Sequence, residues 1–154
     1  MSFILSLTSV AIVAAFTVSN SALVSLLDCT DEENESAIEK GLDTMFVDQE
    51  LLVKTLQGFD CHMQCAENEI RVETSCGVLR YARSSAAENF KMYVDEIHDV
   101  DALIRNIRAF EVDYGRNVQS YTYDHIRQNL ADNMTIADME VQDDDCLYLT
   151  INLE

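Results

Sequence analysis

Apolar residues at helical spacing form the longest regular pattern in this chain. They recur every three to four residues from Val100 to Leu130, which corresponds to about eight helical turns. Asp99 can cap the start of this helix, and Gly115 interrupts its interior at a cost of about 1 kcal/mol relative to alanine. The pattern therefore predicts either one long, bent helix or two helices that meet near Gly115.

Strand and turn signals flank this helix on both sides. We expect strands over residues 61–66, 70–74, 78–82 and 90–94, and a C-terminal hairpin with arms over 134–141 and 146–153. A short helix is expected over 49–57, because Asp48 can cap its start and Gly58 can end it. Together these elements predict an α+β fold, in which an antiparallel sheet of about five strands packs against one short and one long helix.

The N-terminal segment from Phe3 to Leu27 contains no charged residue. It is long enough for a helix that crosses a bilayer, which needs about 20 mostly apolar residues, and Thr17, Ser21 and Ser25 follow the small-xxx-small spacing of closely packed helices. We expect an apolar helix over residues 1–27, and two environments stay open for it: a membrane, or the interior of the protein or of an oligomer. A cleaved secretory signal is disfavoured, because no Lys or Arg precedes the apolar run.

An acidic segment follows this predicted helix. Residues 28–50 carry nine acidic side chains and one Lys, as expected of a solvated linker. The sequence therefore predicts an apolar helix over 1–27, an acidic linker over 28–47 and an α+β domain over 48–154.

Charge restricts the classes of partner. The chain has 10 Lys and Arg against 28 Asp and Glu, a formal net charge of -18, and a hydrophobic fraction of 48%. The hydrophobic fraction is too high for a disordered acidic tail. The excess of negative charge disfavours direct binding of nucleic acids and of anionic lipid head groups, because both depend on Lys and Arg.

Five cysteines raise the question of a metal site or disulfides. An odd number without a cleaved signal favours a reducing, cytoplasmic location, with or without a membrane tether through residues 3–27. Cys61, Cys65 and Cys76 are the candidate metal ligands, but Cys61 and Cys65 would lie about 13 Å apart on one strand, too far to share a zinc ion. We therefore expect small buried cysteines and no cofactor.

Catalytic motifs are missing from the sequence. His98 and His125 have no nucleophile beside them, and Asp143, Asp144 and Asp145 lack the alternation of a calcium loop, so they fit a solvated turn. No glycine-rich phosphate loop, nucleophile elbow or zinc-protease motif occurs. We expect no enzyme activity.

One face of the long helix is a candidate partner surface. Arg116, Tyr123 and Arg127 lie off the apolar stripe and share a second face, which should be exposed. Arg and Tyr are enriched among the residues that dominate binding energy at protein interfaces. These three residues are therefore the predicted contact surface for a protein partner.

The C-terminal two thirds of the chain resembles a family of small proteins of unknown function, the hypothetical chloroplast open reading frame 35 type. The resemblance covers residues 46–154 and rests on DQELLVKTLQGF before a strand, on YxxxVxxYTYDHI from Tyr114, and on the hairpin MTIADMEVQDDDCLYLTINLE. Bacterial members of that family often accompany an AAA-type ATPase, so the resemblance implies an accessory or adaptor role. The apolar N-terminal segment and the high acidity depart from the family pattern.

These observations favour a non-catalytic, acidic protein-interaction module, accessory to an AAA-type ATPase and with a membrane tether as one open alternative. Two other classes remain open: an acidic mimic of nucleic acid that blocks a basic cleft, and a cysteine-based metal or redox protein. The mimic requires acidic side chains along one face. The metal protein requires the sulfur atoms of Cys61, Cys65 and Cys76 within about 4 Å of a common point.

Overall fold

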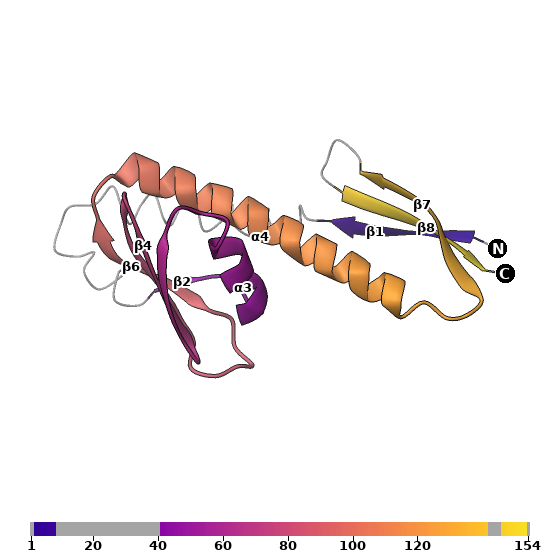
Figure 1. Cartoon of the computed structure of the whole chain (residues 1–154), viewed down its shortest axis with the longest axis horizontal. Helices are drawn as coiled ribbons and strands as arrows, with labels where there is room; N and C mark the ends of the chain where they lie inside the picture. The colour runs from indigo at the N-terminus through magenta and orange to yellow at the C-terminus, as the bar shows by residue number, and fades with distance from the viewer. Residues whose placement is uncertain (1, 9–40, 142–145, 154) are drawn as a thin grey trace.

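The computed structural model describes residues 2–8, 41–141 and 146–153, and these residues form two antiparallel sheets and two helices (Figure 1). The elements in chain order are β1 (Ser2–Thr8), β2 (Leu42–Asp43), α3 (Gln49–Leu56), β3 (His62–Ala66), β4 (Glu69–Thr74), β5 (Gly77–Ala82), β6 (Lys91–Ile97), α4 (Val100–Gln128), β7 (Met134–Val141) and β8 (Cys146–Leu153). The predicted α+β class is confirmed, with a five-stranded sheet as its largest unit.

The five-stranded sheet has the strand order β2-β6-β5-β4-β3. Strands β3 to β6 are consecutive antiparallel neighbours, as the alternation of their residues predicted. Alternate residues on β4 and β5 are buried, including Ile70, Val72, Leu79 and Tyr81. They pack with residues of α3 and α4 in one hydrophobic core.

Capping side chains fix the start of both helices. Asp48 accepts hydrogen bonds from the backbone N–H groups of Glu50 and Leu51 at 2.8 and 3.0 Å, as expected for the N-cap of α3. Asp99 does the same for Ala102 at the start of α4, at 2.9 Å. The predicted short helix is therefore confirmed to within one residue at its C-terminal end.

Helix α4 continues through Gly115, so of the two predicted alternatives the structure has one long helix and not two helices. It is one helix of 29 residues, about 43 Å long at 1.5 Å per residue. Its buried residues are Leu103, Ile107, Phe110, Tyr114 and Gly115. The cost of one glycine, about 1 kcal/mol, is small against the packing of this stripe on the sheet.

The segment just before α3 belongs to the folded core, and the predicted linker over 28–47 is wrong for its last residues. Leu42 and Asp43 form β2 on the edge of the sheet, and the hydroxyl of Thr44 donates a hydrogen bond to the carbonyl of Phe90. Thr44 and Phe46 point inward, whereas Met45 and Val47 are half-exposed. This alternation of four residues was hidden by the acidic residues around it; residues 28–40 lie outside the described part of the chain.

Phe46 lies at the centre of an aromatic cluster. It is 2% exposed, and its ring lies 5.7 Å from that of Tyr81, 5.2 Å from that of Phe110 and 4.6 Å from that of Tyr114, all edge-to-face. The cluster joins β5, α4 and the segment before α3.

The C-terminal hairpin forms as predicted but belongs to a second sheet, with strand order β1-β8-β7. Strand β1 pairs with β8, and Phe3, Leu5 and Leu7 lie opposite Ile151, Leu149 and Leu147. Residues 2–8 of the segment predicted as an N-terminal helix thus form a strand, whose partner strand lies about 140 residues away in sequence. The rest of that predicted helix lies outside the described residues, within which no helix is both long enough and apolar enough to cross a membrane.

Candidate functional site

The predicted partner surface lies on the C-terminal half of α4, and we call Arg116, Tyr123 and Arg127 the α4 face. Their spacing of seven and four residues places them on one side of a continuous helix, spanning about 16 Å along its axis. Arg116 and Arg127 are exposed and Tyr123 is half-buried. The guanidinium group of Arg116 forms an ion pair with the carboxylate of Asp113, one turn earlier on the helix, at 3.5 Å.

The helix segment that carries the α4 face buries no residue. The stripe of buried residues on α4 ends at Gly115, and every residue from 116 to 128 is exposed or half-buried. Tyr121 is 55% exposed, and its ring stacks on that of His125 with the ring centroids 6.3 Å apart. In Figure 1, this half of α4 extends from the five-stranded sheet toward the second sheet.

Three arginines of the five-stranded sheet and the loop that follows β5 have internal partners. Arg71 and Arg80 lie opposite each other on the outer face of the five-stranded sheet, and both pair with Asp95, at 3.5 and 3.3 Å. Arg80 also lies over the ring of Tyr93, 4.3 Å from its centroid. Arg83 donates to the carbonyl of Val47 at 2.7 Å and holds the loop before β6. These three side chains stabilise the sheet, whereas Arg116 and Arg127 are exposed on α4.

The three candidate metal ligands do not meet. Cys61 precedes β3, and its thiol donates to the carbonyl of Leu56 at 3.3 Å. Cys65 is exposed on β3, and Cys76 is buried in the β4–β5 turn, where Asn106 donates to its sulfur at 3.1 Å. Within residues 2–8, 41–141 and 146–153, no group of three or more His, Cys, Asp and Glu side chains could hold a metal ion.

The two histidines considered from the sequence have local partners only. His98 lies 3.4 Å from the carboxylate of Glu96, and both side chains are more than half exposed. His125 stacks on Tyr121 and contacts the amide of Asn129 at 3.4 Å. Neither of these contacts supplies a nucleophile.

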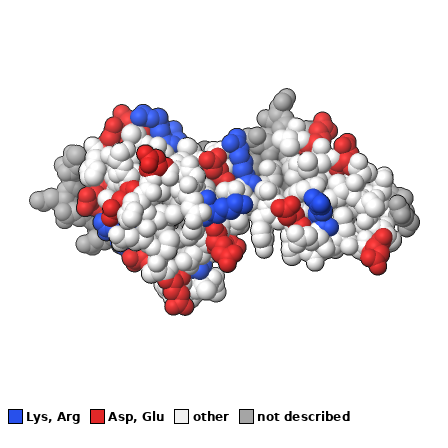
Figure 2. Space-filling view, viewed as in Figure 1, with Lys and Arg blue, Asp and Glu red and all other residues white. Residues whose placement is uncertain are grey.

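Acidic side chains do not form one stripe on the face of the molecule shown in Figure 2, where they are scattered and lie among Lys and Arg. A mimic of nucleic acid needs a continuous row of negative charge to occupy a basic cleft. This face of the molecule presents no such row.

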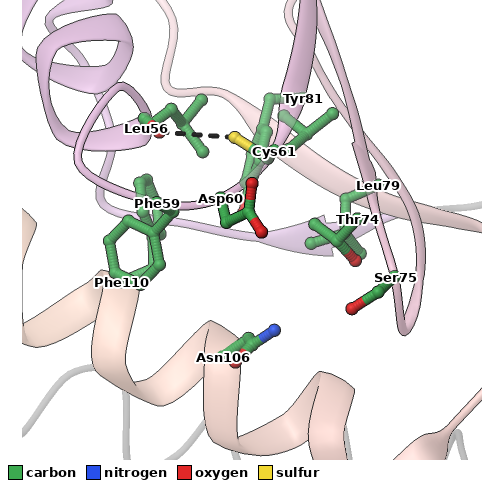
Figure 3. Close-up of a pocket in the computed structure, with 11 residues that line it drawn as sticks. Leu56, Phe59, Asp60, Cys61, Thr74, Ser75, Leu79, Tyr81, Asn106 and Phe110 are labelled. Carbon is green, nitrogen blue, oxygen red and sulfur yellow. Dashed lines mark hydrogen bonds between the residues drawn. The ribbon is translucent and has the colours of Figure 1, made fainter.

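A cavity of about 170 Å³, which was not among the predicted sites, lies between the sheet, the end of α3 and the first half of α4 (Figure 3). We call it the core cavity. Its lining residues are Leu56, Phe59, Asp60, Cys61, Val72, Thr74, Ser75, Leu79, Tyr81, Asn106 and Phe110.

Burial changes the proton affinity of groups beside the core cavity. It raises the pKa of the Cys61 thiol, with the nearby Asp60 carboxylate as a second cause, and it raises the pKa of the Tyr81 hydroxyl strongly. Burial also raises the pKa of Glu111 to about 7, against the opposing effect of Arg108. Cys61 and Tyr81 are therefore neutral at pH 7, and the thiol is a poor nucleophile.

One sequence signal could have indicated where α4 makes polar contacts with the rest of the fold. Asn106, Glu111 and Asn117 are polar, yet each follows or precedes a buried residue of α4 by three or four positions. Asn117 uses this placement to donate to the hydroxyl of the buried Thr55 at 2.8 Å. Polar residues beside the apolar stripe therefore indicate where side chains of α4 form hydrogen bonds with the rest of the fold.

Comparisons with protein-family models, with curated proteins and with solved structures found no match to this chain.

Proposed function

We propose that this chain is a non-catalytic protein-interaction module that binds a protein partner through the α4 face. The observation that supports this most directly is the ordered half of α4 from residue 116 to 128, which buries no residue and presents Arg116, Tyr123 and Arg127 on one side. Arg and Tyr are enriched among the residues that contribute most to binding.

Charge indicates which partner surface would fit. The protein carries a net charge of -18, so an acidic partner is repelled at long range, except where arginines stand out from the surface. The α4 face supplies two such arginines. We infer a partner that is basic overall and has carboxylates where it meets Arg116 and Arg127, because guanidinium groups form strong paired hydrogen bonds with carboxylates.

The family resemblance adds a class of partner, an AAA-type ATPase, to which this chain would be an accessory or adaptor protein. This part of the proposal rests on the resemblance alone. It is tested by the identity of the proteins that bind.

The experiment is affinity purification of the tagged full-length chain from its native host, followed by mass spectrometry of the bound proteins. The triple variant Arg116→Glu, Tyr123→Ala, Arg127→Glu should bind the partner at least tenfold more weakly, because truncation of a strong interface residue costs about 2 kcal/mol of binding free energy. Arg105→Glu is the matched control, because Arg105 is exposed on the first half of the same helix.

Two results would contradict the proposal. A chain that is purified alone and monomeric under gentle conditions has no stable partner. A partner that the triple variant retains as well as the control binds elsewhere on the protein.

A further inference from the structure

The core cavity extends from a solvent-exposed opening, beside Asp60, Ser75 and Asn106, to the buried residues Leu79 and Tyr81. Interiors are packed as tightly as organic crystals and hold few voids larger than a water molecule. An apolar cavity of about 150 Å³ is large enough to hold benzene in other proteins, and the core cavity has about 170 Å³. It can therefore hold a ligand with one six-membered ring.

The walls of the core cavity are chemically divided. Phe59 and Phe110 lie together on one side of it, with their ring centroids 5.8 Å apart, and Leu56, Val72 and Leu79 add aliphatic surface (Figure 3). Thr74 and Ser75 lie on the opposite side, and Asn106 reaches it from α4. The body of a bound ligand would thus contact apolar walls, and one of its ends would contact hydrogen-bonding groups.

Among the lining residues that the structure describes, one carries a charge. Asp60 is exposed, and Figure 3 shows its carboxylate between the aromatic pair and Ser75. The thiol of Cys61 and the hydroxyl of Tyr81 are neutral, and no Lys, Arg or His of the described part of the chain lines the cavity. The charge at the opening is negative, as is that of the whole protein.

We propose that the core cavity binds a small organic cation, an amine whose apolar body is about the size of one aromatic ring. The ring fills the space between Phe110 and Leu79, and the ammonium group meets the carboxylate of Asp60. This site is separate from the α4 face, because Asn106 and Phe110 belong to the first half of α4.

Three probes of similar size test this inference on the full chain at pH 7. Benzylamine is a cation, benzyl alcohol is neutral and benzoate is an anion. Titrations followed by amide NMR should show saturable binding of benzylamine with a Kd of about 1 mM or lower, which is reasonable for a ligand of this size. Benzyl alcohol should bind about three to ten times more weakly, because the pairing with an exposed carboxylate is screened by water, and benzoate should bind most weakly.

Variants locate the binding site. Leu79→Phe fills the cavity and should remove the binding of benzylamine and benzyl alcohol. Asp60→Asn should weaken benzylamine to the level of benzyl alcohol, and Asp132→Asn, the same change at an exposed residue outside the cavity, should leave both unchanged. If Leu79→Phe does not fold, Ser75→Phe in the exposed β4–β5 turn closes the cavity instead.

Alkylation provides a second measurement. Bound benzylamine should slow the reaction of Cys61 with iodoacetamide, as followed by tandem mass spectrometry, while the exposed Cys65 reacts at an unchanged rate. Saturable binding that depends on Leu79 and Asp60 supports the proposal. It is overturned if none of the probes binds saturably, as for a cavity that holds only water, if binding survives both cavity-filling variants, or if benzoate binds as tightly as benzylamine.

Discussion

Shortening the side chain of Phe46 tests whether the segment before α3 is part of the core. Phe46 is 2% exposed and contacts the rings of Tyr81, Phe110 and Tyr114 edge-to-face. Leucine keeps most of the buried apolar volume but removes these contacts, each worth about 0.5–1.5 kcal/mol and not fully additive. We expect Phe46→Leu to lower the free energy of unfolding by about 1–2 kcal/mol, and Phe46→Ala to lower it by about 3–5 kcal/mol.

Urea unfolding of the full chain measures this effect. The chain has 6 Tyr and no Trp, so tyrosine fluorescence and far-ultraviolet circular dichroism can be followed together. With a slope of about 2 kcal/mol per M urea, Phe46→Leu should lower the midpoint by about 0.5–1 M. Met45→Leu is the matched control, because Met45 is adjacent and 50% exposed, and it should change the midpoint little. Equal midpoints for Phe46→Leu and the wild-type chain would refute the assignment of this segment to the core.

Two further predictions follow from the structure. The pKa of Glu111 is about 7 in the folded chain, against an ordinary value of 4.5 for a glutamate. Between pH 4.5 and pH 7 the folded chain therefore holds a proton that the unfolded chain releases. The free energy of unfolding should fall as the pH rises through this range. Because solvent screens this half-buried group, Glu111→Gln should reduce the fall in unfolding free energy by about 1 kcal/mol, as measured by urea unfolding at pH 5 and pH 8. The control variant Glu88→Gln changes an exposed residue and should keep the pH dependence of the wild-type chain. Equal pH dependence in the two variants would contradict the prediction. Gly41 has a φ of 68°, and a Cβ atom there would lie 2.7 Å from the ring of Tyr93. Gly41→Ala should therefore lower the free energy of unfolding by about 1–2 kcal/mol and the thermal midpoint by several degrees. A variant as stable as the wild-type chain would be inconsistent with this geometry.

The elements that could be predicted from the sequence are those whose signals are local. The capping residues Asp48 and Asp99, the alternation in β4 and β5, and the spacing from Val100 onward each act within one element, and all correspond to observed structure. The predictions that failed depended on partners far away in sequence. Strand β1 pairs with β8 at the other end of the chain, and Phe46 is buried by rings from β5 and α4.

The candidate sites divide in the same way. The α4 face could be predicted because helical periodicity alone places its three residues together. The core cavity could not, because it is the space left where the end of α3, two strands and α4 meet. A residue pattern within one helix or strand cannot predict a cavity that forms between four elements.

The length of α4 connects the fold to the proposed function. Its buried residues run from Leu103 to Gly115 and span about 18 Å, whereas the whole helix is about 43 Å long. An isolated helix of 12 to 15 residues is only marginally stable in water, and Gly115 weakens this one at the point where packing on the sheet ends. Half-buried Val118 and Ile126 provide limited packing for the remaining turns within the described residues. Among the described residues, the second half of α4 therefore extends beyond the core on which its first half packs, and this is the physical basis for placing the proposed contact surface at the α4 face.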